Sequence, residues 1–247
     1  MRKQTIISFL LALCYGIAFY FLQFILYKLG MVGTKPTGDN IIAWDANWYQ
    51  DIVNYGSRYW AETNSSAGFF ILFPLLWKLL GLNGWTVSFF NLLLFSTGFA
   101  IFNSLYKVDL RTKLLWLTIP SFYFAWVPYT ESLFILLVVV CFAGIIHKKR
   151  YCIWISLFLL ALTRPATLVL VPAFFFMELI CNDKKSWRQS VKDFMILYAL
   201  PLLTGLATFI IYQYYATGVW FAYFKLQSTA WGHEFSIPTL PFSSIFG

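Results

Sequence analysis

The chain has 247 residues, of which 60% are hydrophobic and 21% aromatic, while only 11% are charged. A soluble globular protein is roughly 25% charged, so this composition excludes an ordinary soluble domain. It indicates a polytopic membrane protein in which residues 1–247 form a single membrane domain. The net charge of +8 is explained by the basic residues that membrane proteins gather on their cytoplasmic side, so the lipid bilayer is the expected partner and nucleic acid is not.

The first membrane span is predicted over residues 6–29, a run long enough to cross the ~30 Å hydrocarbon core of a bilayer. Arg2 and Lys3 precede this run, in an arrangement that also occurs in signal peptides. The run is too long for the apolar part of a signal peptide, and it has no small-residue cleavage site. An uncleaved span is therefore the better interpretation.

Residues 30–84 are predicted to form an extracytoplasmic loop with helices that lie on the membrane surface. Between residues 44 and 55, aromatic and aliphatic residues recur at helical spacing, with acidic and amide side chains off that stripe. The stripe consists of Trp44, Trp48, Ile52 and Tyr55. The pattern indicates an amphipathic helix with its indole rings at headgroup depth. Residues 69–80 are apolar but short and contain Pro74, which predicts a second interfacial or re-entrant helix; a short full span is the alternative.

Further spans are predicted at residues 85–106, 114–127, 132–146, 152–163, 166–180 and 194–217, which gives an all-α bundle of about seven spans. With the N-terminus in the cytoplasm, 12 of the 18 Lys and Arg residues fall on the cytoplasmic side. The six on the other side are Lys28, Lys35, Arg58, Lys78, Arg164 and Lys225. This asymmetry supports the predicted topology, because cytoplasmic loops are enriched in basic residues.

The same topology places Asp45, Asp51, Glu131 and Arg164 on one side of the membrane, together with His233 of the C-terminal segment. Glu131 and Arg164 lie in the turns of helix pairs whose members are only about 12–15 residues long, and at ~1.5 Å per residue such helices fall short of a bilayer. Their turns should therefore lie in a cavity below the outer headgroups. A charged side chain at that depth is costly unless it is paired or functional.

Asp45 is the candidate general base. Partial burial raises the pKa of a carboxylate towards the working pH, which makes the carboxylate a better acceptor for a proton. The alternative is structural, because an aspartate in this position also caps a helix that begins at Ala46.

Glu131 and Arg164 each have a functional and a structural interpretation. Glu131 either faces the cavity, where it holds acceptor hydroxyls or orients Arg164, or it simply suits the dipole of the helix that it begins. The planar guanidinium of Arg164 suits a phosphate, and Pro165 begins a helix whose free N–H groups also favour an anion. A structural ion pair with Glu131 is the alternative.

The four cysteines are interpreted as small packing residues, because no two of them have the spacing of metal ligands. They are Cys14, Cys141, Cys152 and Cys181. His233 stands alone in the C-terminal segment and is weak evidence by itself. No metal and no cofactor is expected.

Several short motifs, taken together and in order, resemble the PIG-V-like family of mannosyltransferases, the GPI mannosyltransferase 2 type and its bacterial relatives. They are residues 44–49 (WDANWY), Gly56, residues 69–75 (FFILFPL), residues 128–132 (PYTES) and residues 162–165 (LTRP). A looser match is Gln227 with Trp231 and Gly232. Each motif is short, but the ordered set covers about residues 40–170.

The resemblance implies a GT-C fold and the transfer of a sugar, mannose in characterised relatives, from a polyprenyl-phosphate donor to a hydroxyl of a glycan or glycolipid acceptor outside the cytoplasm. Such hexosyltransferases invert the anomeric centre and use no nucleotide sugar. Asp45 matches the acid of the family's loop, the catalytic base. The expected substrate-binding residues are Trp44, Trp48, Tyr49, Asp51, Glu131, Arg164 and His233.

Two departures from the family are visible. Relatives often have two acidic residues close together in this loop, whereas Asp51 is six residues from Asp45. Relatives also continue for more spans, so the chain is expected to be a fragment or a short member. A multi-pass protein of a bacterial cell membrane is expected, with the endoplasmic reticulum membrane as the alternative.

A different class of function stays open from the sequence. A lipid-binding or lipid-flipping membrane protein, or an inactive subunit, would use the same cavity and Arg164 to hold a polyprenyl phosphate without catalysis. An ion-coupled transporter is disfavoured, because the chain lacks the inverted repeat of many such folds.

Overall fold

The computed structural model describes residues 2–180 and 186–230, and the regular elements within these ranges are helical. The first half contains α1 (Arg2–Lys28), α2 (Asp45–Tyr55), a 3₁₀ turn (Ser66–Gly68), α3 (Leu72–Leu79), α4 (Gly84–Tyr106), α5 (Leu110–Leu117) and a 3₁₀ helix (Pro120–Ala125). The second half contains α6 (Glu131–Ile146), α7 (Arg150–Ala161), a 3₁₀ helix (Pro165–Val169), α8 (Leu170–Ile180), α9 (Trp187–Phe194), a π-helical turn (Met195–Ala199), α10 (Leu200–Thr217) and α11 (Ala222–Thr229).

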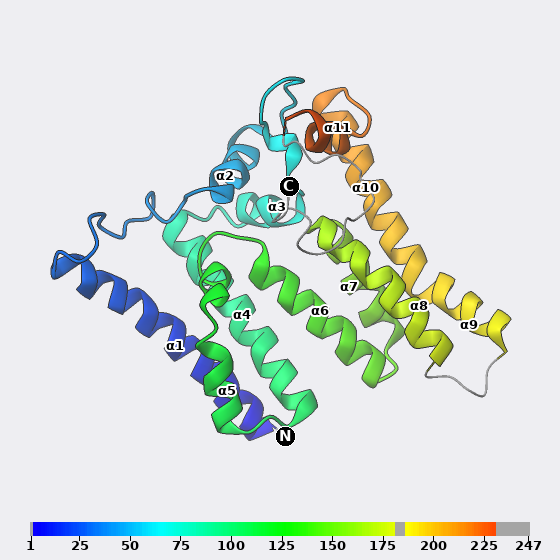
Figure 1. The fold of residues 1–247 in the computed structure, drawn as a ribbon, viewed down its shortest axis with the longest axis horizontal. Coiled ribbons are helices and arrows are strands. Elements are labelled where there is room, and N and C mark those ends of the chain that lie inside the picture. Colours follow the sequence, from blue (N-terminus) through cyan, green and yellow to red (C-terminus); the bar gives the residue numbers. More distant parts are fainter. Residues whose placement is uncertain (1, 181–185, 231–247) are drawn as a thin grey trace, which may run out of the picture.

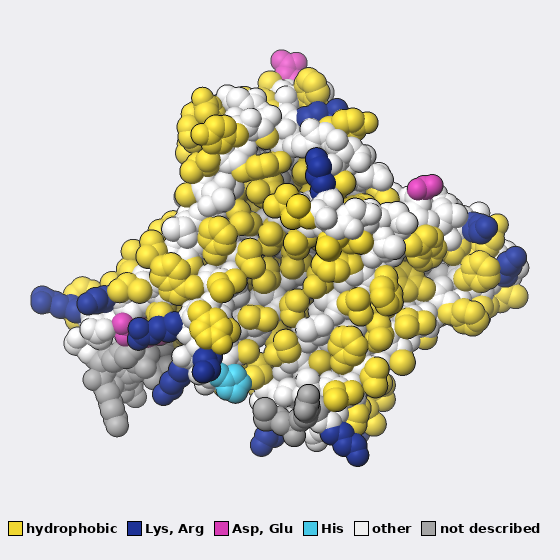
Figure 2. Space-filling model, turned by 180° about the vertical axis from the view of Figure 1, so that it is seen from behind, with side chains coloured by type: hydrophobic (Ala, Val, Ile, Leu, Met, Phe, Trp, Pro, Cys, Tyr) yellow, Lys and Arg dark blue, Asp and Glu magenta, His cyan; other side chains and the backbone are white. Residues whose placement is uncertain are grey.

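The longer helices pack side by side in the order α1, α4, α6, α7 and α10. Helices α2, α3 and α11 gather at one end of this layer (Figure 1). Within the residues that the structure describes, three helical segments are long and apolar enough to cross a membrane: Lys3–Lys28, Gly84–Tyr106 and Trp187–Thr217. Hydrophobic side chains cover the middle of the face in Figure 2, and basic side chains lie mainly at its margins. The prediction of an all-helical bundle with membrane-length helices is confirmed.

One predicted span is not a continuous helix. Residues 114–127 do not form a continuous helix, because α5 ends at Leu117 and a separate 3₁₀ helix begins at Pro120. Ile119 has an extended backbone, as expected for a residue that precedes proline, and Pro120 has no N–H to continue the hydrogen-bond ladder.

The C-terminal predicted spans are also interrupted. Pro165–Val169 is a 3₁₀ helix in front of α8, and the π-helical turn Met195–Ala199 separates α9 from α10. Pro201 explains this turn, because it cannot donate the hydrogen bond that α-helical geometry requires at that point. α3 has only eight residues, which is about 12 Å of helix, so the alternative of a full span over residues 69–80 is excluded.

Small residues allow two of the helix contacts to be close. A Cβ atom at Gly205 of α10 would lie 2.5 Å from the carbonyl oxygen of Phe158 in α7, and one at Gly98 of α4 would lie 3.2 Å from the Cα atom of Leu136 in α6. Small residues at such contacts are typical of helices that pack in membranes, where backbones approach closely.

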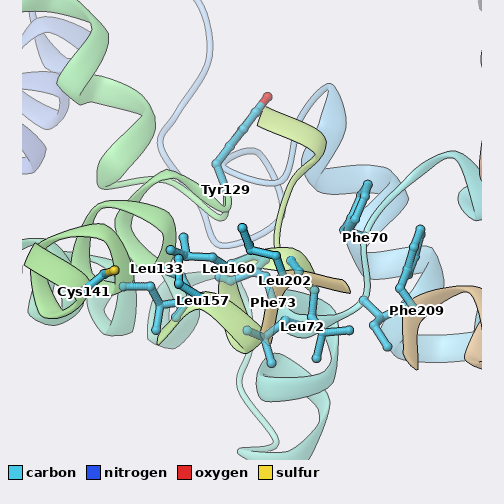
Figure 3. Packing of buried hydrophobic residues seen from close by; sticks show 14 of the residues in the cluster. Phe70, Leu72, Phe73, Tyr129, Leu133, Cys141, Leu157, Leu160, Leu202 and Phe209 are labelled. Atoms are coloured by element: carbon cyan, nitrogen blue, oxygen red, sulfur yellow. The ribbon is translucent and has the colours of Figure 1, made fainter. Parts of the chain in front are cut away.

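The main hydrophobic core joins the layer to the helices at its end. Leu133, Leu157 and Leu160 of α6 and α7 belong to it, as does Cys141, which confirms the packing role predicted for this cysteine. Phe70 and Phe209 stack face to face with ring centroids 4.1 Å apart (Figure 3). Cys152 is half-buried and Cys14 is exposed, while Cys181 lies outside the described residues. The core therefore fixes the loop before α3 against α7 and α10, next to the candidate site.

Candidate active site at the start of helix α2

Asp45 is the first residue of α2. The residue before it, Trp44, is the N-cap and has a φ of 50°, a left-handed backbone that is uncommon for a residue other than glycine. The N-cap is thus Trp44 and not Asp45, and no side chain makes a capping hydrogen bond. The capping role considered for Asp45 is wrong, although its charge still suits the positive end of the helix dipole.

Glu131 and Arg164 form an ion pair, with Oε1 of Glu131 2.6 Å from Nη1 of Arg164. The pair joins the first residue of α6 to the turn that follows α7, and the two side chains are only 25% and 36% exposed. The second carboxylate oxygen of Glu131, Oε2, is buried and has no hydrogen-bond partner within the described part of the chain. This oxygen is available to accept a hydrogen bond from a hydroxyl group.

The charges of Asp45 and Arg164 act on each other. Desolvation raises the pKa of the Asp45 carboxyl above its ordinary value, and the positive charge of Arg164 partly opposes this effect. The Asp45 side chain itself remains accessible from the surface. A carboxylate that is accessible and has a raised pKa meets the requirements for a general base.

Two tyrosines border the three charged residues. Tyr49 is 6% exposed, and its ring lies edge-on to those of Phe69, Phe73 and Tyr129. Burial, followed by the charge of Asp45, raises the pKa of Tyr129 to about 12. Burial also raises the pKa of Tyr49, so both hydroxyls stay protonated at neutral pH.

The tryptophans of the predicted stripe are less buried than Tyr49. Trp48 stacks on Phe69 with ring centroids 6.0 Å apart, and Trp44 is 70% exposed. The buried face of α2 consists of Ala46, Tyr49 and Ile52. The predicted stripe is therefore wrong as a single face, because Trp44 precedes the helix and Ile52 packs into the protein.

Asn91, in the middle of α4, holds the turn that carries Tyr129 and Glu131. Its side-chain amide donates hydrogen bonds to the carbonyl oxygens of Val127 and Tyr129, the latter at 2.8 Å. The hydroxyl of Tyr129 in turn donates to the carbonyl oxygen of Ala43, 3.1 Å away. These bonds connect α4 to the segment that enters α2. The sequence analysis missed Asn91, although an amide within a long apolar run is a recognisable signal.

Arg164 is positioned by backbone contacts of its neighbours. Its own backbone is extended in front of Pro165, and the hydroxyl of Thr167 donates to the carbonyl oxygen of Leu160 at 2.9 Å. The N–H of Leu72 donates to the carbonyl oxygen of Leu162 at 3.0 Å, which ties α3 to the end of α7.

Arg164 is one of the residues that line an apolar cavity of about 200 Å³, which we call the Arg164 cavity. The other residues that line it include Phe70, Val171, Leu202, Leu206 and Tyr223. An apolar cavity with one cation at its border suits a ligand that has a hydrocarbon chain and an anionic head.

The remaining predicted site residues do not join this cluster. Asp51 forms an ion pair with Arg58, whose Nε lies 3.2 Å from Oδ2 of Asp51. His233 lies outside the described residues. Within residues 2–180 and 186–230, no three His, Cys, Asp or Glu side chains gather as metal ligands.

No known protein family, curated protein or solved structure matches this chain. The resemblance to PIG-V-like enzymes stays a prediction from sequence motifs, and the function is inferred from the geometry of Asp45, Glu131 and Arg164.

Proposed function

We propose that this protein is a multi-pass membrane glycosyltransferase of the GT-C type that moves a sugar, mannose by its resemblance to PIG-V-like enzymes, from a polyprenyl-phosphate donor to an acceptor hydroxyl. The observation that carries the proposal is the gathering of Asp45, Glu131 and Arg164 beside the Arg164 cavity. The three residues are distant in sequence, and each has the chemistry that one part of this reaction requires.

Asp45 is the general base. Its carboxylate takes the proton from the acceptor hydroxyl while the hydroxyl oxygen forms a bond to the anomeric carbon of the sugar. The bond from that carbon to the phosphate oxygen breaks, and the carrier phosphate leaves with the bonding electrons. Because the hydroxyl attacks from the face opposite the phosphate, the anomeric configuration is inverted.

Arg164 stabilises the phosphate that leaves. Arg164 lines the Arg164 cavity, so a polyprenyl chain that occupies the cavity would have its phosphate near this arginine. Glu131 orients Arg164 through the ion pair, and its free oxygen accepts a hydrogen bond from a hydroxyl of the sugar or the acceptor.

The orientation follows from the distribution of basic residues. The N-terminus lies in the cytoplasm and Asp45 on the opposite side, where α2 and α3 rest on the membrane surface. In this arrangement residues 110–128 cross back between α4 and α6, and the shorter apolar helices α6, α7 and α8 are the other additional spans. A bacterial cell membrane is the proposed location.

Replacement of Asp45 by Asn tests the proposal. We expect transfer of radiolabelled mannose from polyprenyl-phosphate mannose, measured in membranes that contain the full chain, to fall roughly 10²- to 10⁴-fold. Asp39→Asn is the matched control, because Asp39 is an exposed aspartate six residues earlier in the same loop. Turnover by Asp45→Asn at the control rate would remove Asp45 from the reaction.

A second function is favoured by the ion pair itself. The bond to Glu131 uses Nη1 of Arg164, so other N–H groups of the guanidinium can bind a phosphate beside the Arg164 cavity without any need for Asp45. A lipid-binding or lipid-flipping protein, or an inactive subunit, would bind polyprenyl phosphate and transfer no sugar. Binding of polyprenyl phosphate by the wild type, together with no transfer to any acceptor in a membrane extract, would identify this function.

A further inference from the structure

Gln213 is a fully buried amide in α10, within a segment that is long and apolar enough to cross a membrane. A polar side chain in such a segment is costly unless it makes specific contacts. Both ends of this amide are used. Nε2 donates to the carbonyl oxygen of Ala67 at 2.6 Å, and Oε1 accepts a hydrogen bond from the backbone N–H of Tyr223 at 2.9 Å. Gln213 therefore joins two segments that lie far apart in the sequence.

The bond to Tyr223 caps α11 from a neighbouring helix. Tyr223 is the second residue of α11, so its N–H has no partner within the helix, and the N-cap residue Phe221 supplies no side-chain bond. α11 lies beside the end of α10 (Figure 1). Its apolar contact with the 3₁₀ turn before α3 is small, and the buried members of that contact are Ala67, Ala222 and Leu226. The two hydrogen bonds of Gln213 therefore do much to hold α11 against this turn.

The two segments that Gln213 joins supply aromatic side chains to the Arg164 cavity. Phe70, just after the 3₁₀ turn, lines the cavity, as do Tyr223 and Phe224 of α11. We call these three residues the aromatic wall. Phe70 stacks on Phe209, one turn before Gln213 in α10 (Figure 3), and lies edge-on to Tyr223 with ring centroids 5.0 Å apart. Gln213 thus fixes the position of the aromatic wall.

The aromatic wall faces only a short part of any long ligand. The cavity of about 200 Å³ is smaller than the ~300–1,000 Å³ of sites that enclose a drug-sized molecule. With a phosphate near Arg164, the part of a polyprenyl chain inside the cavity is the part next to the phosphate. The two bonds of Gln213 go to backbone groups of the wall segments and not to Asp45, Glu131 or Arg164. Its effect should therefore be on binding and not on the chemical step.

We propose that Gln213 is a positioning residue for the hydrocarbon chain of the donor. It joins α11 to the turn before α3 and so holds the aromatic wall against the isoprene units next to the phosphate. The identity of this chain as the donor rests on the proposed function, whereas the effect of Gln213 on the binding of a polyprenyl phosphate does not.

Replacement of Gln213 by Leu removes both hydrogen bonds and keeps the size of the side chain. We expect the KM for polyprenyl-phosphate mannose to rise about tenfold, the size of effect that lost aromatic contacts produce, and kcat to change by less than about twofold. The affinity for polyprenyl phosphate alone, measured by titration of the full chain in detergent, should fall by the same factor. A lower kcat with an unchanged KM would show a merely structural role and overturn the proposal.

Asn103→Leu is the matched control, because Asn103 is a buried amide that donates within its own helix and does not line the Arg164 cavity. We expect its KM and its affinity to stay at the wild-type values. If Gln213→Leu does not fold, Gln213→Asn gives the same test, since its side chain is one methylene too short to reach both partners. An equal rise in KM for the Asn103 control would also overturn the proposal.

Gln213→Glu tests whether the two bonds are responsible. At about pH 5 burial keeps this carboxyl group neutral, and a neutral acid can accept from the N–H of Tyr223 and donate to the carbonyl oxygen of Ala67. We expect its affinity for polyprenyl phosphate to lie within about twofold of the wild type at the same pH, while Gln213→Leu stays about tenfold weaker. Equally weak binding by both variants would contradict the role of the bonds.

A double variant tests whether Gln213 acts through the aromatic wall. Phe70→Leu removes one ring of the wall and should itself raise KM about tenfold. If Gln213 acts by holding that ring, Gln213→Leu adds little in the Phe70→Leu background. A combined rise of about a hundredfold would mean that the two residues act independently, which would overturn the proposal.

The two measurements separate this proposal from the proposed function. Polyprenyl phosphate that binds the wild type without sugar transfer, and binds Gln213→Leu about tenfold less tightly, contradicts the glycosyltransferase and leaves the role of Gln213 in place. Transfer by the wild type with an unchanged KM in Gln213→Leu contradicts the role of Gln213 and leaves the glycosyltransferase in place.

Discussion

The two ion pairs of the described structure use the same chemistry in different surroundings. Asp51 and Arg58 lie seven residues apart, and their side chains are 17% and 43% exposed. Glu131 and Arg164 are 25% and 36% exposed and lie 33 residues apart, and their pair joins α6 to the end of α7 beside a cavity. Because the exposures are similar, burial alone does not separate the two pairs. Sequence separation and the adjoining cavity distinguish the pair that we assign to function.

The largest expected effect is on the rate of sugar transfer, and it distinguishes Arg164 from Arg58. Arg164→Gln should lower sugar transfer roughly 10²- to 10³-fold, because the phosphate that leaves loses its cation. Arg58→Gln removes the same charge from the surface pair and should leave transfer nearly unchanged. The measurement is the transfer rate at saturating polyprenyl-phosphate mannose. Similar losses in both variants would contradict the comparison.

The next effect is on stability and concerns the turn that carries Tyr129 and Glu131. Asn91→Leu leaves the carbonyl groups of Val127 and Tyr129 without their donor, so we expect a loss of about 1–3 kcal/mol in the free energy of unfolding. Thermal unfolding in detergent measures it. Asn103→Leu is the control, because Asn103 is equally buried in α4 but donates only within its own helix, to Phe99. A larger loss for Asn103→Leu would show that the turn does not depend on Asn91.

Double-mutant cycles compare the pairs directly. The cycle of Glu131→Gln and Arg164→Gln should give a coupling energy of roughly 1–3 kcal/mol, because this pair lies beside an apolar cavity and joins α6 to the end of α7. The cycle of Asp51→Asn and Arg58→Gln should give about 1 kcal/mol or less. Both are measured by unfolding under the same conditions. Equal coupling energies would mean that the cavity does not strengthen its ion pair.

The smallest effect is a shift in pH dependence. Asp45 must be deprotonated to act as a base, so activity falls as the pH decreases through its pKa. Arg164 lowers that pKa, and its replacement by Gln should therefore move the acidic limb of the pH–rate profile to higher pH. Arg58→Gln should leave the limb in place. A shift of the limb to lower pH in Arg164→Gln would contradict the assigned interaction.

The sequence predicted which charged residues lie together better than it predicted the contacts that support them. Charged side chains in apolar surroundings are rare enough to identify Glu131 and Arg164, and the predicted topology placed them with Asp45. The structure brings these three together, and the ion pair considered as an alternative is present.

The supports depend on contacts between distant parts of the chain. Asn91 contacts residues 36 and 38 positions away, and no local pattern specifies that pairing. The break in the helix at Pro120 was not predicted, because the length of an apolar run does not show where the backbone departs from helical geometry. The buried face of α2 was misassigned because spacing cannot show where the helix begins, and Trp44 lies before that point.

The shortness of α6 and α7 has a consequence for the surrounding lipid. With 16 and 12 residues, these helices are about 24 Å and 18 Å long, less than the ~30 Å of a typical hydrocarbon core. A bilayer that meets them accommodates the hydrophobic mismatch by becoming locally thinner. Activity should therefore depend on acyl-chain length and be highest in thin membranes, where water and a polar headgroup come nearest to Glu131.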